Sequence, residues 1–150
     1  MAEQTDTAVD TSAGSPSVLF VCVKNSGKSQ MAAALMRSLA GDQVEVYSAG
    51  TKPGDSVNAL SAQAVAEIAA SMEGEAPKAI DPDLLRRVDR VVVLGSDAVV
   101  HPVEGMRGTI ENWETDEPST RGVDGIDRMH LIRDDILARC ERLLSAMRGH

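Results

Sequence analysis

Near its N-terminus the chain reads Ser17-Val-Leu-Phe-Val-Cys22-Val-Lys-Asn25-Ser-Gly27-Lys28-Ser29-Gln-Met-Ala-Ala-Ala34. The apolar, β-branched run that ends at Cys22 predicts a strand, and the Ala/Met run after Ser29 predicts a helix. The short glycine-containing loop between them directs successive N–H groups inward, and the helix N-terminus adds its positive end. The stretch therefore predicts an anion-binding loop, with a cysteine at the strand end where open α/β sheets keep their chemistry.

A cysteine in such a loop is a candidate nucleophile. The thiolate is the reactive form, and a helix N-terminus, N–H donors, a hydroxyl such as that of Ser29 and a cation such as Lys28 all favour it. The same donors hold a tetrahedral oxyanion against the sulfur, which is the arrangement for thiol attack on phosphate or arsenate. We predict that the oxyanion binds to the loop formed by Val23, Lys24, Asn25, Ser26, Gly27, Lys28 and Ser29.

Two other interpretations of this stretch remain open. A cysteine at the end of a buried strand is often a small core residue, because free cysteine is among the most buried residue types. Residues 22–29 also match the nucleotide P-loop pattern except that Cys22 replaces its first glycine. The later apolar run Val91–Leu94 leads into Gly95 with no aspartate to hold a magnesium ion, which disfavours the nucleotide interpretation.

The loop resembles a known family. Cys22, Asn25 at plus three, the basic Lys28 at plus six and Ser29 at plus seven resemble the C-x5-R-S loop of the low-molecular-weight tyrosine phosphatase superfamily. The continuation into Gln30-Met-Ala resembles its arsenate reductase branch. Two later segments are also similar to the family, Ser48-Ala-Gly-Thr-Lys-Pro53 and Trp113-Glu-Thr-Asp116-Glu117-Pro118, and the resemblance runs from Val18 to Leu144.

The resemblance implies that a carboxylic acid protonates the oxygen that leaves arsenate or phosphate. Glu117 directly precedes Pro118, as the acid does in the phosphatase pattern, whereas the reductase branch has two acidic residues before the proline, which favours Asp116. We therefore keep Asp116 and Glu117 as alternative acids. The structural alternative for this segment is a turn beside a helix cap.

Two departures from the family pattern point to the reductase branch and to an external reductant. Lys28 replaces an arginine, and an ammonium cannot make the planar bidentate grip that suits phosphoester hydrolysis. Thioredoxin-coupled arsenate reductases carry two more cysteines after the third strand, but residues 80–100 contain none, and the only other cysteine is Cys140. The Gly-Lys-Ser of the loop is similar to the actinobacterial arsenate–mycothiol transferase group.

This similarity implies an arsenate reductase of thiol-transferase type. Its co-substrate would be mycothiol, its partner a mycoredoxin-like (glutaredoxin-like) reductase, and it would hold no bound cofactor. The alternative is a low-molecular-weight protein tyrosine phosphatase acting through a Cys22 phosphoenzyme. A non-enzymatic oxyanion sensor is a third hypothesis, motivated by Lys28.

Composition narrows the class of protein. A net charge of −8 argues against nucleic acid and anionic membranes as partners. Two cysteines in 150 residues favour a reducing compartment, and neither a signal peptide nor a membrane-spanning run is present, so we expect a cytoplasmic location. His101, His130 and His150 show no metal-ligand spacing with the cysteines, so we predict no metal site.

The rest of the chain predicts one α/β domain over residues 17–150, preceded by a disordered tail over residues 1–16. We expect strands at 18–21, 43–48, 91–94 and 109–113, and helices at 28–39, 58–70, 81–87 and 123–147. This alternation predicts a four-stranded parallel sheet in the order 2-1-3-4, with helices on both faces, as in flavodoxin-like and low-molecular-weight phosphatase folds. Cys140 lies on the apolar stripe of the last helix, which predicts an inert buried thiol, with a resolving cysteine as the alternative. Trp113 is expected to pack in the core or against a loop, with stacking on a substrate as the alternative.

Overall fold

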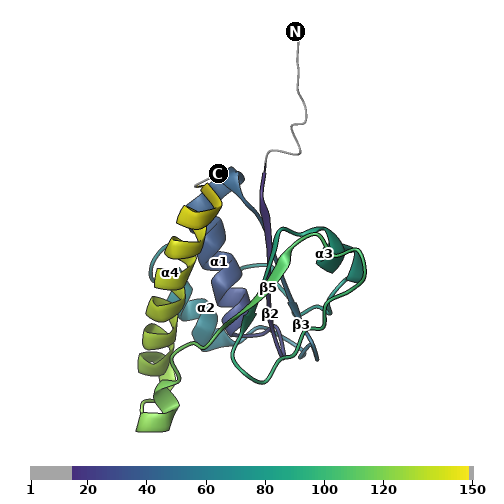
Figure 1. Ribbon diagram of the computed structural model, residues 1–150. Coiled ribbons are helices and arrows are strands. Elements are labelled where there is room, and N and C mark those ends of the chain that lie inside the picture. The colour runs from purple at the N-terminus through teal and green to yellow at the C-terminus, as the bar shows by residue number, and fades with distance from the viewer. Residues whose placement is uncertain (1–14, 149–150) are drawn as a thin grey trace.

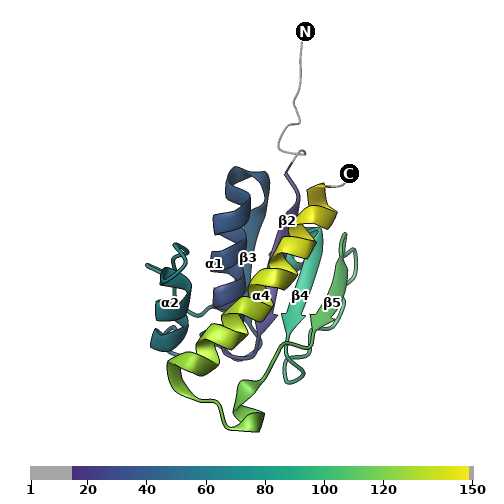
Figure 2. The same ribbon diagram turned by 90° about the vertical axis from the view of Figure 1, so that its left-hand side faces the viewer.

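Four parallel strands form one sheet in the order β3-β2-β4-β5 (Figure 2). The computed structural model describes residues 15–148, and the expected tail of residues 1–16 lies outside this range except for Ser15 and Pro16. The strands are β2 (Ser17–Cys22), β3 (Glu45–Gly50), β4 (Arg90–Leu94) and β5 (Thr109–Trp113). In chain order this is the predicted 2-1-3-4 arrangement, and every neighbouring pair is parallel.

Helices cover both faces of the sheet (Figure 1). On one face lie α1 (Lys28–Ala40), α2 (Ala59–Ala66) and α4 (Gly125–Arg148), and on the other lies the short α3 (Pro82–Arg87). Asp81 caps α3 by accepting a hydrogen bond from the N–H of Asp83, with Pro82 in the first turn, as the sequence predicts. Among the described helices, none combines the length and the apolar character that crossing a membrane requires.

The central strand β2 organises the core because its side chains alternate between two buried faces. Val18 and Phe20 pack with α1 and α4, whereas Leu19 and Val21 pack on the α3 side. Phe20 meets Trp113 with ring centroids 5.8 Å apart, and Trp113 is only 7% exposed. The prediction that Trp113 packs in the core is confirmed.

Cys140 lies at the interface between α4 and α1. Its side chain is fully buried, and its thiol lies 3.7 Å from the carbonyl oxygen of Ala32. Burial, together with the negative charge of Glu141, raises the pKa of the Cys140 thiol to about 12. The prediction that Cys140 is buried is therefore confirmed, and its low reactivity stays a prediction.

The predicted bounds of three elements are wrong. The last helix begins at Gly125 and not at residue 123, and the second strand continues to Gly50, past its predicted end at residue 48. The second strand begins at Glu45, not at residue 43, because residues 41–43 form the 3-10 turn η2 (Gly41–Gln43). The second helix ends at Ala66 and not at residue 70. Ala69 adopts a left-handed conformation with φ of 66°, its N–H bonds to the carbonyl of Ala66, and the N–H of Ala70 bonds to Val65. A Schellman cap usually has glycine at the position that Ala69 occupies, so no residue marks the end of this helix as a stop signal.

Candidate active site

The loop between β2 and α1 turns its carbonyl groups outward, toward the segment that follows β3. Four of these carbonyls accept hydrogen bonds from backbone N–H groups of that segment. The carbonyl of Cys22 accepts from the N–H of Thr51 (3.1 Å), that of Val23 from Lys52 (2.7 Å), that of Lys24 from Gly54 (2.9 Å) and that of Ser26 from Asn58 (2.7 Å). Because the C=O and N–H of one trans peptide point in opposite directions, the next N–H group in each case points inward. The loop backbone therefore surrounds a space lined by donors, which suits a tetrahedral oxyanion.

Gly50 allows this loop and the end of β3 to approach each other closely. It is paired with Cys22 in the sheet, and a Cβ atom there would lie 2.6 Å from the carbonyl oxygen of Val23 and 3.0 Å from Asn25. Any side chain at this position would push the loop away from the strand. The glycine in the Ser48-Ala-Gly50 segment thus serves the shape of the anion loop.

Donors in the loop are directed at the Cys22 sulfur. The N–H of Lys78 donates to Oδ1 of Asn25 at 3.0 Å, which fixes the orientation of the Asn25 amide. With this orientation, Nδ2 of Asn25 donates to Oγ of Ser29 at 2.7 Å. Because Oγ of Ser29 accepts that bond, its own hydroxyl proton is free to be donated to Sγ of Cys22, 2.9 Å away. The N–H of Asn25 donates to the same sulfur at 3.3 Å. The Ser29 hydroxyl and the Asn25 N–H therefore both point at the Cys22 sulfur.

Asn25 is the centre of this network. It is fully buried and has a φ of 53°, a left-handed conformation that asparagine tolerates better than most residues. The buried Gln30 donates to both the backbone carbonyl and Oδ1 of Asn25, each at 3.2 Å. These bonds leave little freedom in the shape of the loop.

Lys28 places its charge against the segment that follows β5. Its Nζ donates to Oε1 of Glu117 at 2.7 Å, and its side chain is 22% exposed. Lys24, Lys52 and Lys78, the other lysines near the loop, are exposed, and Nζ of Lys78 lies 3.5 Å from Oδ1 of Asn25. The structure thus brings together the predicted cation and one of the two predicted acids.

Glu117 is held as a carboxylate by two cations. Arg128, in the first turn of α4, donates to its Oε2 at 2.8 Å, and Ser119 donates to the same oxygen at 3.2 Å. Burial favours the neutral acid, but the hydrogen bonds from Lys28 and Arg128 outweigh it and lower the pKa of Glu117 to about 2.

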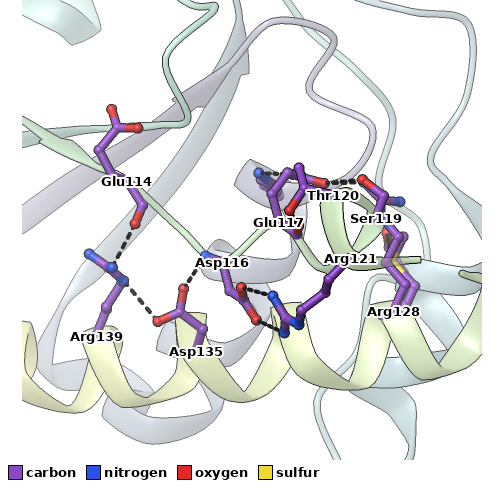
Figure 3. A network of polar contacts seen from close by, with 12 residues as sticks. Glu114, Asp116, Glu117, Ser119, Thr120, Arg121, Arg128, Asp135 and Arg139 are labelled. Atoms are coloured by element: carbon purple, nitrogen blue, oxygen red, sulfur yellow. Dashed lines mark hydrogen bonds and ion pairs between the residues drawn. The ribbon is translucent and has the colours of Figure 1, made fainter. Parts of the chain in front are cut away.

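Asp116 has a different cation (Figure 3). Arg121, in the 3-10 turn η3 (Pro118–Arg121), grips both of its carboxylate oxygens at 2.9 Å, and this bond lowers the pKa of Asp116. The backbone N–H of Asp116 donates to Asp135 of α4 at 2.7 Å. Both candidate acids are therefore ionised at neutral pH in this arrangement, and a proton-donating role for either stays a prediction.

Comparison with known proteins identifies the family of this chain. The model for "Low molecular weight phosphotyrosine protein phosphatase" matches residues 17–150. The chain belongs to this family. A relative from Staphylococcus epidermidis named arsenate reductase 1 is 34% identical over 125 residues, which cover 83% of this chain and 92% of that protein.

Solved structures of an arsenate reductase and of a tyrosine phosphatase are also similar to this chain. A thioredoxin-dependent arsenate reductase of Corynebacterium glutamicum matches with a TM-score of 0.75 and 30% identity. The match covers 93% of this chain but 64% of that one, so this chain spans less than two thirds of its length. A tyrosine phosphatase of Erwinia amylovora, at 18% identity and a TM-score of 0.74 over 88% and 93% of the two chains, shares the fold alone.

Several residues of this phosphatase-like site were not predicted from the sequence. Gln30 carried a weak signal, since a polar side chain stands in an otherwise apolar helix start. Arg121 and Arg128 carried none, because the C-terminal third of the chain contains many arginines with no distinguishing spacing. Among residues 15–148, no three His, Cys, Asp or Glu side chains are grouped closely enough to hold a metal ion.

Proposed function

We propose that this chain is an arsenate reductase of thiol-transferase type, which joins arsenate to a small external thiol such as mycothiol. Relatives named arsenate reductases support the substrate. The observation that carries the external thiol is the state of Cys140. It is the only cysteine besides Cys22, it is fully buried, and its thiol pKa is about 12. The second sulfur that the reaction needs must come from another molecule.

In the proposed reaction, arsenate binds to the loop N–H groups, Ser29 and Lys28. A thiol sulfur displaces one arsenate oxygen, which leaves as water after taking up protons, and an arsenic(V)–sulfur bond forms. A second thiol then attacks that sulfur, so a disulfide forms, the arsenic–sulfur bond breaks, and its electron pair reduces arsenic(V) to arsenic(III). The second thiol belongs to a glutaredoxin-like, mycoredoxin-type reductase. These thiols stay reduced in the cytoplasm, where we propose that the enzyme acts.

Cys22 has two alternative roles in this reaction. Its thiolate attacks arsenic first and passes it to the external thiol, or it binds and polarises arsenate while the external thiol attacks directly. The donors around its sulfur support either role, because they stabilise negative charge at the sulfur and beside it. Asp116 or Glu117 takes up a proton from solvent once its ion pair opens, and then passes that proton to the departing oxygen.

Arsenite production distinguishes the possible reductants. One reaction contains arsenate, mycothiol and a mycoredoxin-type reductase, and another contains thioredoxin with its reductase, the system in the name of the Corynebacterium relative. We expect activity in the first only, and activity that persists in Cys140→Ala but not in Cys22→Ala. Activity in the second only, abolished by Cys140→Ala, would show that α4 opens and that the external-thiol proposal is wrong.

A further inference from the structure

Lys28 is shared between the anion loop and Glu117. It stands at the first position of α1, where the loop N–H groups converge, yet its ammonium contacts a carboxylate at 2.7 Å. Beside the loop lies a cavity of about 140 Å³, lined by Ser26, Gly27 and Lys28 on one side and by Arg128 on the other. Arg128 is thus a close neighbour of the oxyanion site, although no feature of the sequence assigns it a role.

The two cations bind different oxygens of the same carboxylate. Lys28 holds Oε1 of Glu117 and Arg128 holds Oε2, from α1 and α4 respectively. Figure 3 shows Arg128 reaching Glu117 from the helix below it. The two cations beside one carboxylate repel each other, so the net energy that holds Lys28 beside Glu117 is smaller with Arg128 present than without it. Arg128 therefore weakens the hold of Glu117 on Lys28.

We propose that Glu117 is an internal competitor of the oxyanion for Lys28, and that Arg128 is a positioning residue that limits this competition by holding Glu117. An ammonium has three N–H donors, and Glu117 takes one of them. An incoming oxyanion must take the others or displace the carboxylate. This inference rests on the oxyanion site of the proposed function, and it adds that Glu117 and Arg128 set how tightly that site binds an oxyanion.

The cluster predicts opposite effects for its two members. Glu117→Gln removes the competitor and leaves both cations, so oxyanion binding tightens by about tenfold, since near-surface charges a few ångströms apart interact by more than 1 kcal/mol. Arg128→Gln commits Glu117 to Lys28, so binding weakens by roughly fivefold. If Arg128 acts through Glu117, the double variant binds the oxyanion like Glu117→Gln alone, because the residue that Arg128 controls is absent.

Protection of Cys22 from iodoacetamide measures oxyanion binding without any reductase. The alkylation rate is titrated with inorganic arsenate, and separately with inorganic phosphate, for the wild type and each variant. Cys140 does not interfere, because it is buried. Arg128→Lys keeps one bond to Glu117 and should lie close to the wild type. Arg142→Gln makes the same chemical change on the same helix, with no contact to Glu117 in the described structure, and should leave protection unchanged.

Three outcomes would overturn the proposal. If Arg128→Gln weakens protection equally with and without Glu117, Arg128 acts directly as a charge. If Glu117→Gln weakens protection, Glu117 supports Lys28 and does not compete with the oxyanion. If neither anion protects Cys22 in any variant, the loop is not the oxyanion site. Arsenite production by the wild type is measured separately. If the wild type produces arsenite but the variants show one of the contrary protection results, this inference is refuted and the proposed function is not.

Discussion

The anion loop and the segment of residues 114–121 meet at the same site but are built by different interactions. Asn25, Ser29 and Gln30 in and beside the loop are fully buried and bond to one another and to backbone groups. The 114–121 segment is positioned by arginines at the surface. The side chain of Arg121 is 52% exposed and that of Arg128 is 30% exposed.

This difference predicts a rigid loop and a more adjustable 114–121 segment. A buried polar network is strong when every group is satisfied and costly when one is lost. Exposed ion pairs contribute little to stability and exchange partners readily. Buried hydrogen bonds thus fix the shape of the loop, whereas exposed ion pairs hold the carboxylates beside it, and we expect those pairs to change partners when an oxyanion binds. The following substitutions test this contrast.

Asn25→Gly should give the largest effect. Glycine keeps the left-handed backbone but removes the amide that serves Ser29, Gln30 and the N–H of Lys78. We expect a loss of about 3 kcal/mol in unfolding free energy, measured by urea denaturation, because buried groups lose their partners. Cys22 should also react more slowly with iodoacetamide at neutral pH. Asn58→Gly, which removes a helix N-cap, is the control and should cost only a few tenths of a kcal/mol. Equal losses in the two variants would contradict the central role of Asn25.

Gly50→Ala tests the close approach of loop and strand. The new Cβ would lie 2.6 Å from the carbonyl oxygen of Val23, so the loop must shift, at a cost of about 2 kcal/mol and with weaker oxyanion protection of Cys22. Gly54→Ala is the matched control, because its Cβ would have Lys24 at an ordinary 3.7 Å. An unfolding free energy and a protection midpoint within error of Gly54→Ala would refute the steric argument.

Acid pH tests the 114–121 side of the comparison. The pKa of Glu117 falls from its ordinary value of 4.5 to about 2 in the folded protein, so its ion pairs stabilise the fold above pH 4.5. This contribution is lost as the pH falls from 4.5 through 2. Because its side chain is 38% exposed, we expect only about 1 kcal/mol. The difference in unfolding free energy between the wild type and Glu117→Gln, measured by chemical denaturation, should therefore shrink toward zero by pH 2. A difference that grows on acidification would contradict the assignment.

Ala69→Gly should give the smallest effect, with the opposite sign to Asn25→Gly. Ala69 has a φ of 66° in the cap of α2, a conformation that glycine adopts without steric cost. The greater entropy of glycine in the unfolded chain offsets part of this gain, so we expect a stabilisation of about 0.5 kcal/mol. Thermal unfolding measures it as a rise of about 1–2 °C. A lower melting temperature would show that the left-handed residue is not strained.

The same contrast explains what could be predicted from the sequence. The sheet order, the loop and the burial of Cys140 follow from local periodicity and from the strand–loop–helix stretch, so these features were predictable. The end of α2 was not, because an alanine occupies the position where glycine is the usual stop signal. The partners of Asp116 and Glu117 were not predictable either. Arg128 stands 11 residues from Glu117 and meets it only because α4 packs across one face of the sheet.

The burial of Cys140 has a practical consequence for measurement. The folded protein presents one reactive thiol and the unfolded protein presents two, since the chain contains only Cys22 and Cys140. A reagent can reach Cys140 only when α4 separates from α1. The rate at which doubly labelled molecules appear in a mass spectrum therefore measures how fast that helix pair opens. The chain thus carries its own kinetic reporter of opening at the interface between α1 and α4, with no probe introduced.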